Sequence, residues 1–456
     1  MNKVFDVAII GAGVVGAAIA RELSQFDIDV LLLDASDDVG NATSKANTAI
    51  LHTGFDMVPG SLESTLVREG YFLLKKYADQ VAIATEPVGA LLVAWSEEEL
   101  ANLPKIQEKA RANGYLSCEI ISSSQVYLLE PHLGSGALGA LTVPDEWIID
   151  PWSTTVAYAT QAKRAGVQVK LNTKVTKVSH KDDLHTLTTT SGDISTRFVV
   201  NAAGLYSDEI DAMFECKDFT ITPRKGELLV FDKLARSLIS HIILPVPSSM
   251  GKGVLVSPTV FGNIMLGPTA QNIEDKSDTS TTEQGIEFLK AKGAKIAPTL
   301  FNEEITTMYA GLRAATEHSD YQIFLRAEKK LVTVGGIRST GLTASMAIAE
   351  YVRDLLVEGG LKLGKQSVLP QLTMPNLGEA GVRPYQDESL IEKEESYGEI
   401  ICHCERVSRG EIRDALVSDL PATTLGGLGR RTRAGLGRCQ GFYCHAQLRT
   451  LLAGEK

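Results

Sequence analysis

Four of the six cysteines in this 456-residue chain are placed so that they could bind a metal centre. They fall near one end of the chain, at Cys402, Cys404, Cys439 and Cys444. Two thiolates one residue apart can face a second pair and enclose a metal centre between them. Zinc sites usually place two residues inside each cysteine pair, whereas the pairs here enclose one and four. The spacing favours a [2Fe–2S] cluster over zinc, and four unrelated buried cysteines are the remaining alternative.

The segment between the two cysteine pairs is rich in glycine and arginine. Residues 426–438 contain four arginines, Arg430, Arg431, Arg433 and Arg438. Arginines and backbone N–H groups near a thiolate cluster would offset its negative charge and raise its reduction potential. We therefore expect a basic island that either shields the cluster or forms part of a docking face. The two remaining cysteines, Cys118 and Cys216, are expected to be ordinary semi-buried residues.

A second group of residues, near the N-terminus, could hold a dinucleotide. Gly11, Gly13 and Gly16 form the pattern G-x-G-x-x-G. The first glycine allows a tight turn, the second lets the backbone approach a pyrophosphate, and the third lets a helix pack closely on a strand. Asp34 follows at the distance expected of an acid that bonds a ribose hydroxyl. A glycine-rich turn without a ligand is the alternative for the three glycines alone.

The elements around these glycines give the pattern its context. The sequence predicts a strand at 4–10, a helix at 17–23 and a strand at 30–33. The next buried strand, at 198–204, comes far later, which suits a flavin domain with an inserted substrate domain better than a contiguous NAD domain. A final strand at 331–336 leads into a helix from Leu342 to about Leu356. The start of that helix can present N–H groups to the flavin ring.

The middle of the chain alternates polar and apolar residues in short stretches, as β-strands do. Strands are predicted at 91–94, 226–231 and 253–257, in one antiparallel sheet that caps the flavin. The expected fold class is α/β: a Rossmann-type FAD domain, an interleaved antiparallel-sheet (α+β) substrate domain and a small C-terminal cysteine-cluster domain. The expected boundaries are 1–85, 150–217 and 331–372 for the FAD domain, 86–149 and 218–330 for the cap, 373–398 for a solvated acidic linker, and 399–456 for the [2Fe–2S] domain.

Composition narrows the class of protein. The chain is 44% hydrophobic and 22% charged, as folded enzymes are, and its net charge of −11 argues against coating nucleic acid or anionic lipid. Neither a targeting segment nor a run of 18 apolar residues is present. Cysteines clustered at one end of a large chain are typical of a metal site in a reducing compartment. We expect a cytoplasmic protein that reaches a membrane only through a partner.

Five further stretches of the chain carry a resemblance to a known family: 48–54, 223–227, 251–253, 311–313 and 336–343. Through them, residues 1–370 are similar to FAD-dependent oxidoreductases of the D-amino-acid-oxidase superfamily, and within it to glycerol-3-phosphate dehydrogenases and oxidases. The last 55 residues, roughly, with their four cysteines, resemble the iron–sulfur module of bacterioferritin-associated ferredoxin, which also ends the anaerobic glycerol-3-phosphate dehydrogenase A subunit.

The resemblance implies roles for particular residues. His52 is implied beside flavin and substrate, where an imidazole can accept a proton near neutral pH. Arg313 can bind a phosphate or carboxylate with its planar fork, and Lys252 is implied to contact the substrate. The alternatives are a structural histidine and two surface cations. The residues implied for FAD, beyond those of the glycine pattern, are Thr43, Ser44, Ala203, Gly204, Gly336, Arg338, Ser339, Gly341, Leu342 and Thr343.

The implied reaction is oxidation of a small anionic substrate, sn-glycerol 3-phosphate, to dihydroxyacetone phosphate. The hydride would pass to flavin N5, and electrons would leave through the [2Fe–2S] cluster to a protein partner, a subunit complex or a quinone pathway. Because L-2-hydroxyglutarate dehydrogenases and amine oxidases share the scaffold, another 2-hydroxy acid or a secondary amine such as hydroxyproline stays open. A non-catalytic electron-relay subunit is the third possibility, and the presence of His52, Lys252 and Arg313 argues against it.

Overall fold

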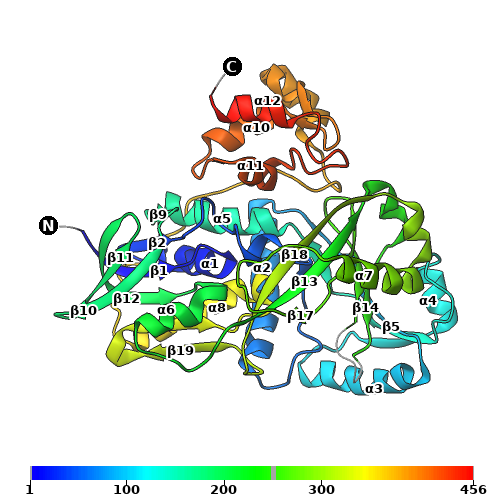
Figure 1. Cartoon of the computed structure of the whole chain (residues 1–456), viewed down its shortest axis with the longest axis horizontal. Helices are drawn as coiled ribbons and strands as arrows, with labels where there is room; N and C mark the ends of the chain where they lie inside the picture. The colour runs from blue at the N-terminus through cyan, green and yellow to red at the C-terminus, as the bar shows by residue number, and fades with distance from the viewer. Residues whose placement is uncertain (1–2, 248–252, 455–456) are drawn as a thin grey trace.

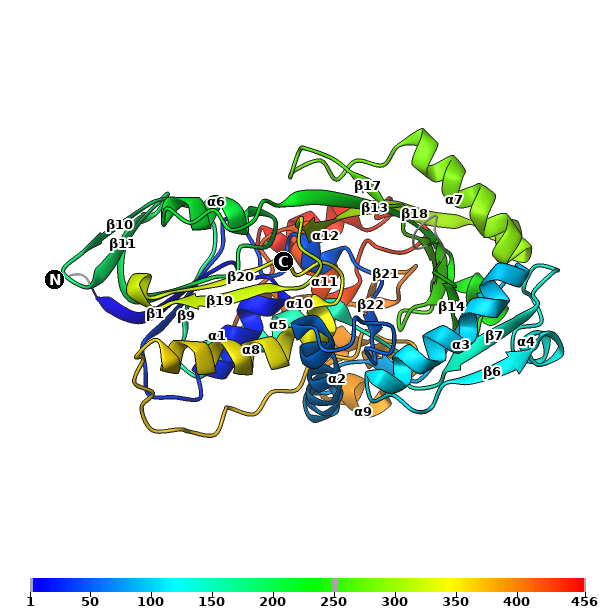
Figure 2. The ribbon, with the colours of Figure 1, turned by 90° about the horizontal axis from the view of Figure 1, so that it is seen from below.

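The computed structural model describes residues 3–247 and 253–454. Two sheet-based units lie side by side, and a small C-terminal module rests on top of them (Figure 1). Seen from below, the two sheets occupy opposite ends of the molecule, with helix α2 (Leu62–Val81) near the middle (Figure 2). In the part of the chain described here, no helix is both long and apolar enough to cross a membrane.

The first sheet has a parallel centre. Strands β20 (Leu331–Gly335), β12 (Gly192–Asn201), β1 (Val4–Ile10), β2 (Val30–Leu33) and β9 (Gln168–Lys170) run parallel in that order. Antiparallel strands join it on the side away from β9: β10 (Val175–Lys181) and β11 (Leu184–Thr189) continue from β12, and β19 (Gln322–Arg326) pairs with β20. The strands predicted at 4–10, 30–33 and 331–336 are found here in a Rossmann-type arrangement, and the strand predicted at 198–204 is β12, which begins earlier and ends at Asn201.

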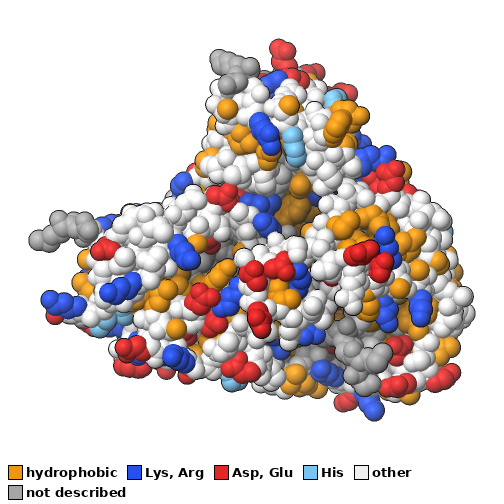
Figure 3. Space-filling view, viewed as in Figure 1, with side chains coloured by type: hydrophobic (Ala, Val, Ile, Leu, Met, Phe, Trp, Pro, Cys, Tyr) orange, Lys and Arg blue, Asp and Glu red, His pale blue; other side chains and the backbone are white. Residues whose placement is uncertain are grey.

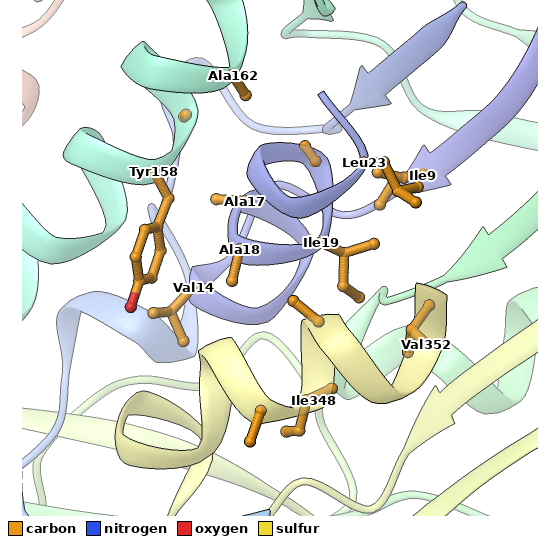
Figure 4. Packing of buried hydrophobic residues seen from close by; sticks show 14 of the residues in the cluster. Ile9, Val14, Ala17, Ala18, Ile19, Leu23, Tyr158, Ala162, Ile348 and Val352 are labelled. Atoms are coloured by element: carbon orange, nitrogen blue, oxygen red, sulfur yellow. The ribbon is translucent and has the colours of Figure 1, made fainter. Parts of the chain in front are cut away.

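Three helices pack against one another beside this sheet. Helix α1 (Val14–Leu23) lies between α5 (Pro151–Arg164) and α8 (Gly341–Glu358), as Figure 4 shows. Small residues on α1, such as Ala17 and Ala18, let Tyr158 of α5 and Ile348 of α8 approach closely. Helices α1 and α8 therefore start close together, at the carboxyl ends of β1 and β20.

The second sheet has nine strands and a separate apolar core. Its strands are β17 (Gln271–Asn272), β18 (Ile305–Ala315), β13 (Thr222–Phe231), β16 (Ile264–Gly267), β15 (Leu255–Pro258), β14 (Ile242–Pro245), β5 (Ala90–Ala94), β7 (Gly139–Val143) and β6 (Glu119–Ser122). Its outer helices are α3 (Glu97–Ala112), α4 (Ser123–Leu129) and α7 (Glu283–Ile296). The three strands predicted for the cap are in this sheet.

The cap differs from expectation in three respects. Strand β14 pairs with β5 in parallel, so the sheet is not antiparallel throughout. Strand β19 falls inside the expected cap range of 218–330, yet it pairs with β20 of the first sheet. A separate three-stranded sheet joins β3 (Ile50–Leu51), β8 (Trp147–Ile149) and β4 (Thr85–Glu86) where the units meet. These three features depend on which strands pair across long distances in the sequence, and local sequence patterns do not predict such pairing.

The C-terminal module has its own small core. Its elements are β21 (Ile400–Cys402), β22 (Val407–Ser408), α10 (Arg409–Val417), α11 (Leu425–Thr432) and α12 (His445–Leu452). The segment before it, expected to be a solvated linker over 373–398, is instead tied to the protein. Leu377 and Arg383 in it are buried, and Arg383 forms ion pairs with Glu379 and Glu411. At least one acidic residue of this segment, Glu379, therefore forms an ion pair inside the protein.

Candidate active site and cluster site

The turn from β1 into α1 can be made only with glycine at two positions. Gly11 has φ +109°, and a Cβ there would overlap the carbonyl oxygen of Ala202. A Cβ on Gly16 would overlap the carbonyl oxygen of Gly11. Helix α1 begins at Val14, and its N-cap residue, Gly13, has no side chain that could cap the helix. Its N-terminal N–H groups and positive dipole end suit an anionic pyrophosphate.

A loop between β2 and Lys45 closes over this turn. Asp34 Oδ2 accepts a hydrogen bond from the Ala12 N–H at 2.6 Å, and Ser44 Oγ accepts one from the Val14 N–H at 2.9 Å. Both predicted cofactor residues therefore lie at the start of α1. The Oγ1 of Thr43, next to Ser44, donates instead to the Leu312 carbonyl at 2.9 Å. The ribose contact of Asp34 and the phosphate contacts of Thr43 and Ser44 stay predictions.

Helix α8 supplies a second uncapped helix start beside the first. Its N-cap residue, Thr340, makes no capping bond, and a Cβ on Gly341 would come within 2.7 Å of Ile337 Cγ2 and 3.7 Å of Val15 Cγ2. The turn before α8 contains Gly336 at φ +65°, and Gly204, after β12, lies at φ +57°. The starts of α1 and α8, neither capped by its own N-cap side chain, and the turns at Gly11, Gly204 and Gly336 form a site that we call the nucleotide cradle. Its shape and the N–H groups of its two helix starts fit a long dinucleotide such as FAD, whose ring has a polar edge.

The remaining residues implied for FAD differ in their contacts. Arg338 forms an ion pair with Glu63 and donates to the Ser319 carbonyl at 2.6 Å, so its charge is already matched inside the protein. Ser339 is exposed, and Leu342 is 9% exposed. Ala203 follows β12 and donates its N–H to Asn201 Oδ1.

His52 is held from two sides at the end of β3. Its backbone N–H donates to Thr343 Oγ1 of α8 at 3.0 Å, and its Nδ1 lies 3.1 Å from Glu146 Oε2. Glu146 is fully buried, and its other oxygen accepts bonds from the N–H and Oγ1 of Thr53. A carboxylate in this position favours the tautomer with the proton on Nδ1, which places the lone pair on Nε2. Sequence patterns carry no signal for Glu146, because only folding brings it to His52.

Arg313 of β18 is a partly buried cation. Its Nη2 donates to the Thr269 carbonyl at 2.9 Å, and among the described residues no carboxylate pairs with it. Burial, with a smaller effect from the charge of Arg224, lowers the pKa of Arg313 to about 10. A guanidinium kept from water without an acidic partner is suited to bind an anion. Lys252, the other predicted substrate contact, lies outside the described residues.

The structure brings the four C-terminal cysteines to one cavity, which they line together with His403 and Tyr443. Within the cavity the thiols lie in two neighbouring pairs, Cys402 beside Cys444 and Cys404 beside Cys439. No three ligating side chains in the described ranges converge as a single metal ion requires. Two facing thiol pairs fit a cluster that divides four ligands between two irons better than one zinc ion.

Backbone N–H groups favour negative charge at the cluster site. The Gly435 N–H points to Cys402 Sγ at 3.4 Å. Burial alone would raise the pKa of Cys439, but hydrogen bonds from the N–H groups of 441–443 and from Cys404 lower it. For Cys444, burial and the neighbouring Cys402 raise the pKa to about 12. The N–H groups near the thiols agree with the expectation that backbone donors offset the cluster's charge.

The arginines of the basic island also form ion pairs inside the protein, and Arg438 interacts electrostatically with Cys404 as well. Arg430 and Arg431 bind Asp38 in the nucleotide-binding half, and Arg438 binds Asp232 in the cap. Arg433 pairs with Glu405 and lies 4.3 Å from the ring centroid of Phe261. They therefore hold the module onto both units, where Figure 3 shows a hollow bordered by Lys or Arg side chains.

Fold and site together define a flavin-type redox protein with an attached cysteine-cluster module. The FAD dependent oxidoreductase family matches residues 6–355, and the BFD-like [2Fe-2S] binding domain matches 400–454. The chain belongs to the FAD dependent oxidoreductase family, and it carries a C-terminal [2Fe–2S] domain. Its cofactors are FAD and a [2Fe–2S] cluster, and it is an oxidoreductase.

Individual relatives extend the likeness. The chain is 37% identical to a glycerol 3-phosphate dehydrogenase of Caloramator mitchellensis, over 99% of this chain and 94% of the relative. It is 25% identical to the A subunit of the anaerobic glycerol-3-phosphate dehydrogenase of Escherichia coli K12, over 98% of this chain and 88% of the relative. The FAD-bound L-alpha-glycerophosphate oxidase of Mycoplasma pneumoniae superimposes with a TM-score of 0.77 at 29% identity, covering 82% of this chain and 99% of that one.

Proposed function

We propose that the protein oxidises sn-glycerol 3-phosphate to dihydroxyacetone phosphate. The observation that carries this proposal is the His52–Glu146 pair, which sits beside the uncapped start of α8. The names of the similar proteins, glycerol 3-phosphate dehydrogenase and oxidase, support the choice of substrate. Arg313 adds a cation without an acidic partner in the described part of the chain, as a phosphate-bearing substrate requires.

The chain's residues would divide the work of the reaction. Oxidation of the C2 alcohol removes a proton from oxygen and a hydride from carbon. His52 Nε2 accepts the hydroxyl proton, and Glu146 holds the ring and stabilises the imidazolium that forms. Arg313 binds the phosphate and fixes the orientation of C2. FAD held at the starts of α1 and α8 would supply the acceptor for the hydride, and a [2Fe–2S] cluster held by the four C-terminal cysteines would supply an electron carrier.

The two sides of the cluster site suit entry and exit of electrons. On the inner side, Glu405 follows a cluster cysteine in sequence and bonds Arg433, which packs on the ring of Phe261. On the outer side, Phe442 and Tyr443 are 83% and 78% exposed between the last two cysteines. Exposed aromatic residues beside a redox centre are suited to contact a protein partner. The relative whose name marks it as part of a multi-chain enzyme supports electron transfer to another chain.

A substrate panel tests the proposal. The full-length protein, loaded with both cofactors, is mixed without oxygen with sn-glycerol 3-phosphate, L-2-hydroxyglutarate or hydroxyproline, and bleaching of the flavin absorption is followed. We expect bleaching at the lowest concentrations with sn-glycerol 3-phosphate. Preferential bleaching by either other compound would replace the substrate assignment, and no bleaching by any of them would favour an electron-relay role.

A further inference from the structure

One buried carboxylate in the nucleotide-binding half, that of Asp38, binds two arginines of the C-terminal module. Arg431 donates to both of its oxygens at 2.8 Å, and Arg430 Nη2 donates to Oδ2 at 2.5 Å. The three residues are at most 7% exposed. Burial would raise the pKa of Asp38, but the hydrogen bonds and charges of Arg431 and Arg430 hold it below its usual value. Charge-assisted bonds shielded from water fix the relative positions of their partners.

Asp38 belongs to the loop at 34–45, which also holds the start of α1. At other residues of the same loop, the Gly40 N–H donates to the Ala12 carbonyl at 2.8 Å and Ser44 Oγ accepts the Val14 N–H. These are the backbone groups that line the nucleotide cradle. The same loop is thus bound by the cradle on one side and by the module on the other.

We propose that the contact of Asp38 with Arg430 and Arg431, here called the loop clamp, couples docking of the cluster module to FAD binding. When the module is docked, the loop is held in the form that closes over the cradle, so FAD binds without a further ordering cost. By linkage, bound FAD strengthens docking of the module to the same degree. The three residues act as positioning residues for FAD.

The charge of the clamp adds to this effect. Two guanidinium groups share one carboxylate, and within the described ranges Arg430 Nε has no hydrogen-bond partner. Burial and then the charge of Arg430 lower the pKa of Lys45 at the end of the loop, and the charges of Asp37 and Asp38 oppose this shift. The clamp therefore leaves excess positive charge beside a loop that serves an anionic pyrophosphate.

The clamp is also connected to the cluster site. Helix α11, which carries both arginines, lies between the two cysteine pairs in sequence. It ends at Arg433 in a left-handed conformation, and two residues later the Gly435 N–H points to Cys402 Sγ. Ligation of all four cysteines would hold this segment, so loading of the cluster is expected to reach the FAD loop through α11.

Two matched variants test the loop clamp in the full-length protein. Asp38→Asn removes the clamped charge. Asp419→Asn breaks another contact between module and body, the 2.7 Å ion pair with Arg164 at the end of α5, which does not touch the loop. The FAD dissociation constant is measured by titrating each deflavinated protein with FAD and following flavin fluorescence. We expect Asp38→Asn to weaken FAD binding by about 5- to 150-fold, the usual range of coupling between sites, and Asp419→Asn to leave it unchanged.

The outcomes separate a clamp from general stabilisation. Wild-type FAD affinity in a folded Asp38→Asn protein would overturn the proposal, and so would equal losses in both variants. If Asp38→Asn does not fold, Arg431→Lys keeps the charge but loses the two-point fork, and the same loss of affinity is expected. Because the readout is FAD binding without substrate, its result is independent of the substrate assignment.

Discussion

The nucleotide cradle and the cluster site bind their cofactors by different means. The cradle is built from backbone: glycines without room for a Cβ and two uncapped helix starts. The cluster site is built from four side chains held in two facing pairs. A backbone site depends on shape, whereas a thiol site depends on chemical identity. Substitutions should therefore affect the two sites in different ways, and each prediction below tests that difference.

The largest expected effect is at the cluster site. Cys439→Ser removes one of the four proposed ligands, so we expect the [2Fe–2S] signal to be lost while the flavin absorption remains. Electron paramagnetic resonance of the reduced protein measures the cluster, and the visible spectrum measures the flavin. Cys216→Ser, which changes a buried cysteine in the core of the first sheet unit, is the control and should keep both signals. An intact cluster signal in Cys439→Ser would contradict the assigned ligands.

The next effect is at the cradle. Gly16→Ala places a methyl group on the Gly11 carbonyl oxygen, so α1 must move away from the turn. We expect purified protein that has lost most of its FAD but keeps its cluster. Gly13→Ala is a graded control, since its Cβ would meet only Ser44 Oγ at 3.2 Å, and its loss should be smaller. Full FAD content in Gly16→Ala would argue against a backbone-shaped site.

His52→Asn tests the proposed acid–base chemistry. If His52 is the general base, its loss should lower the rate of flavin reduction by about 10²- to 10⁴-fold, with little change in substrate binding. Rapid mixing without oxygen gives the rate and the substrate dissociation constant separately. His318→Asn, at a half-exposed histidine, is the control. An unchanged rate would remove His52 from the base role.

Glu146→Gln should have a smaller effect of the same kind, because Glu146 acts through His52. Loss of a hydrogen bond to a charged group costs about 1.5–3 kcal/mol, which corresponds to roughly a 10- to 150-fold slower reduction. The pH profile of flavin reduction should also shift, since the carboxylate favours the imidazolium. A slower rate without any change in the pH profile would indicate a purely structural role.

The two sites were predictable from sequence to different degrees. Glycine spacing and cysteine spacing are local patterns, so the cradle and the cavity of Cys402, Cys404, Cys439 and Cys444 could be foreseen. Glu146 was missed, since it meets His52 only through pairing of β3 with β8. The arginines of α11 were recognised as a group, but their partner Asp38 lies far away in sequence. Long-range contacts decide such roles, and a single sequence carries no mark of them.

The central claim is that one chain uses its two cofactors in series. The most direct test mixes the oxidised full-length protein with sn-glycerol 3-phosphate in the absence of oxygen, and records flavin absorption and the cluster's paramagnetic signal over time. The account predicts that the flavin bleaches first and that the cluster signal of the reduced state then grows in the same molecules. A bleached flavin beside a cluster that stays oxidised would contradict it.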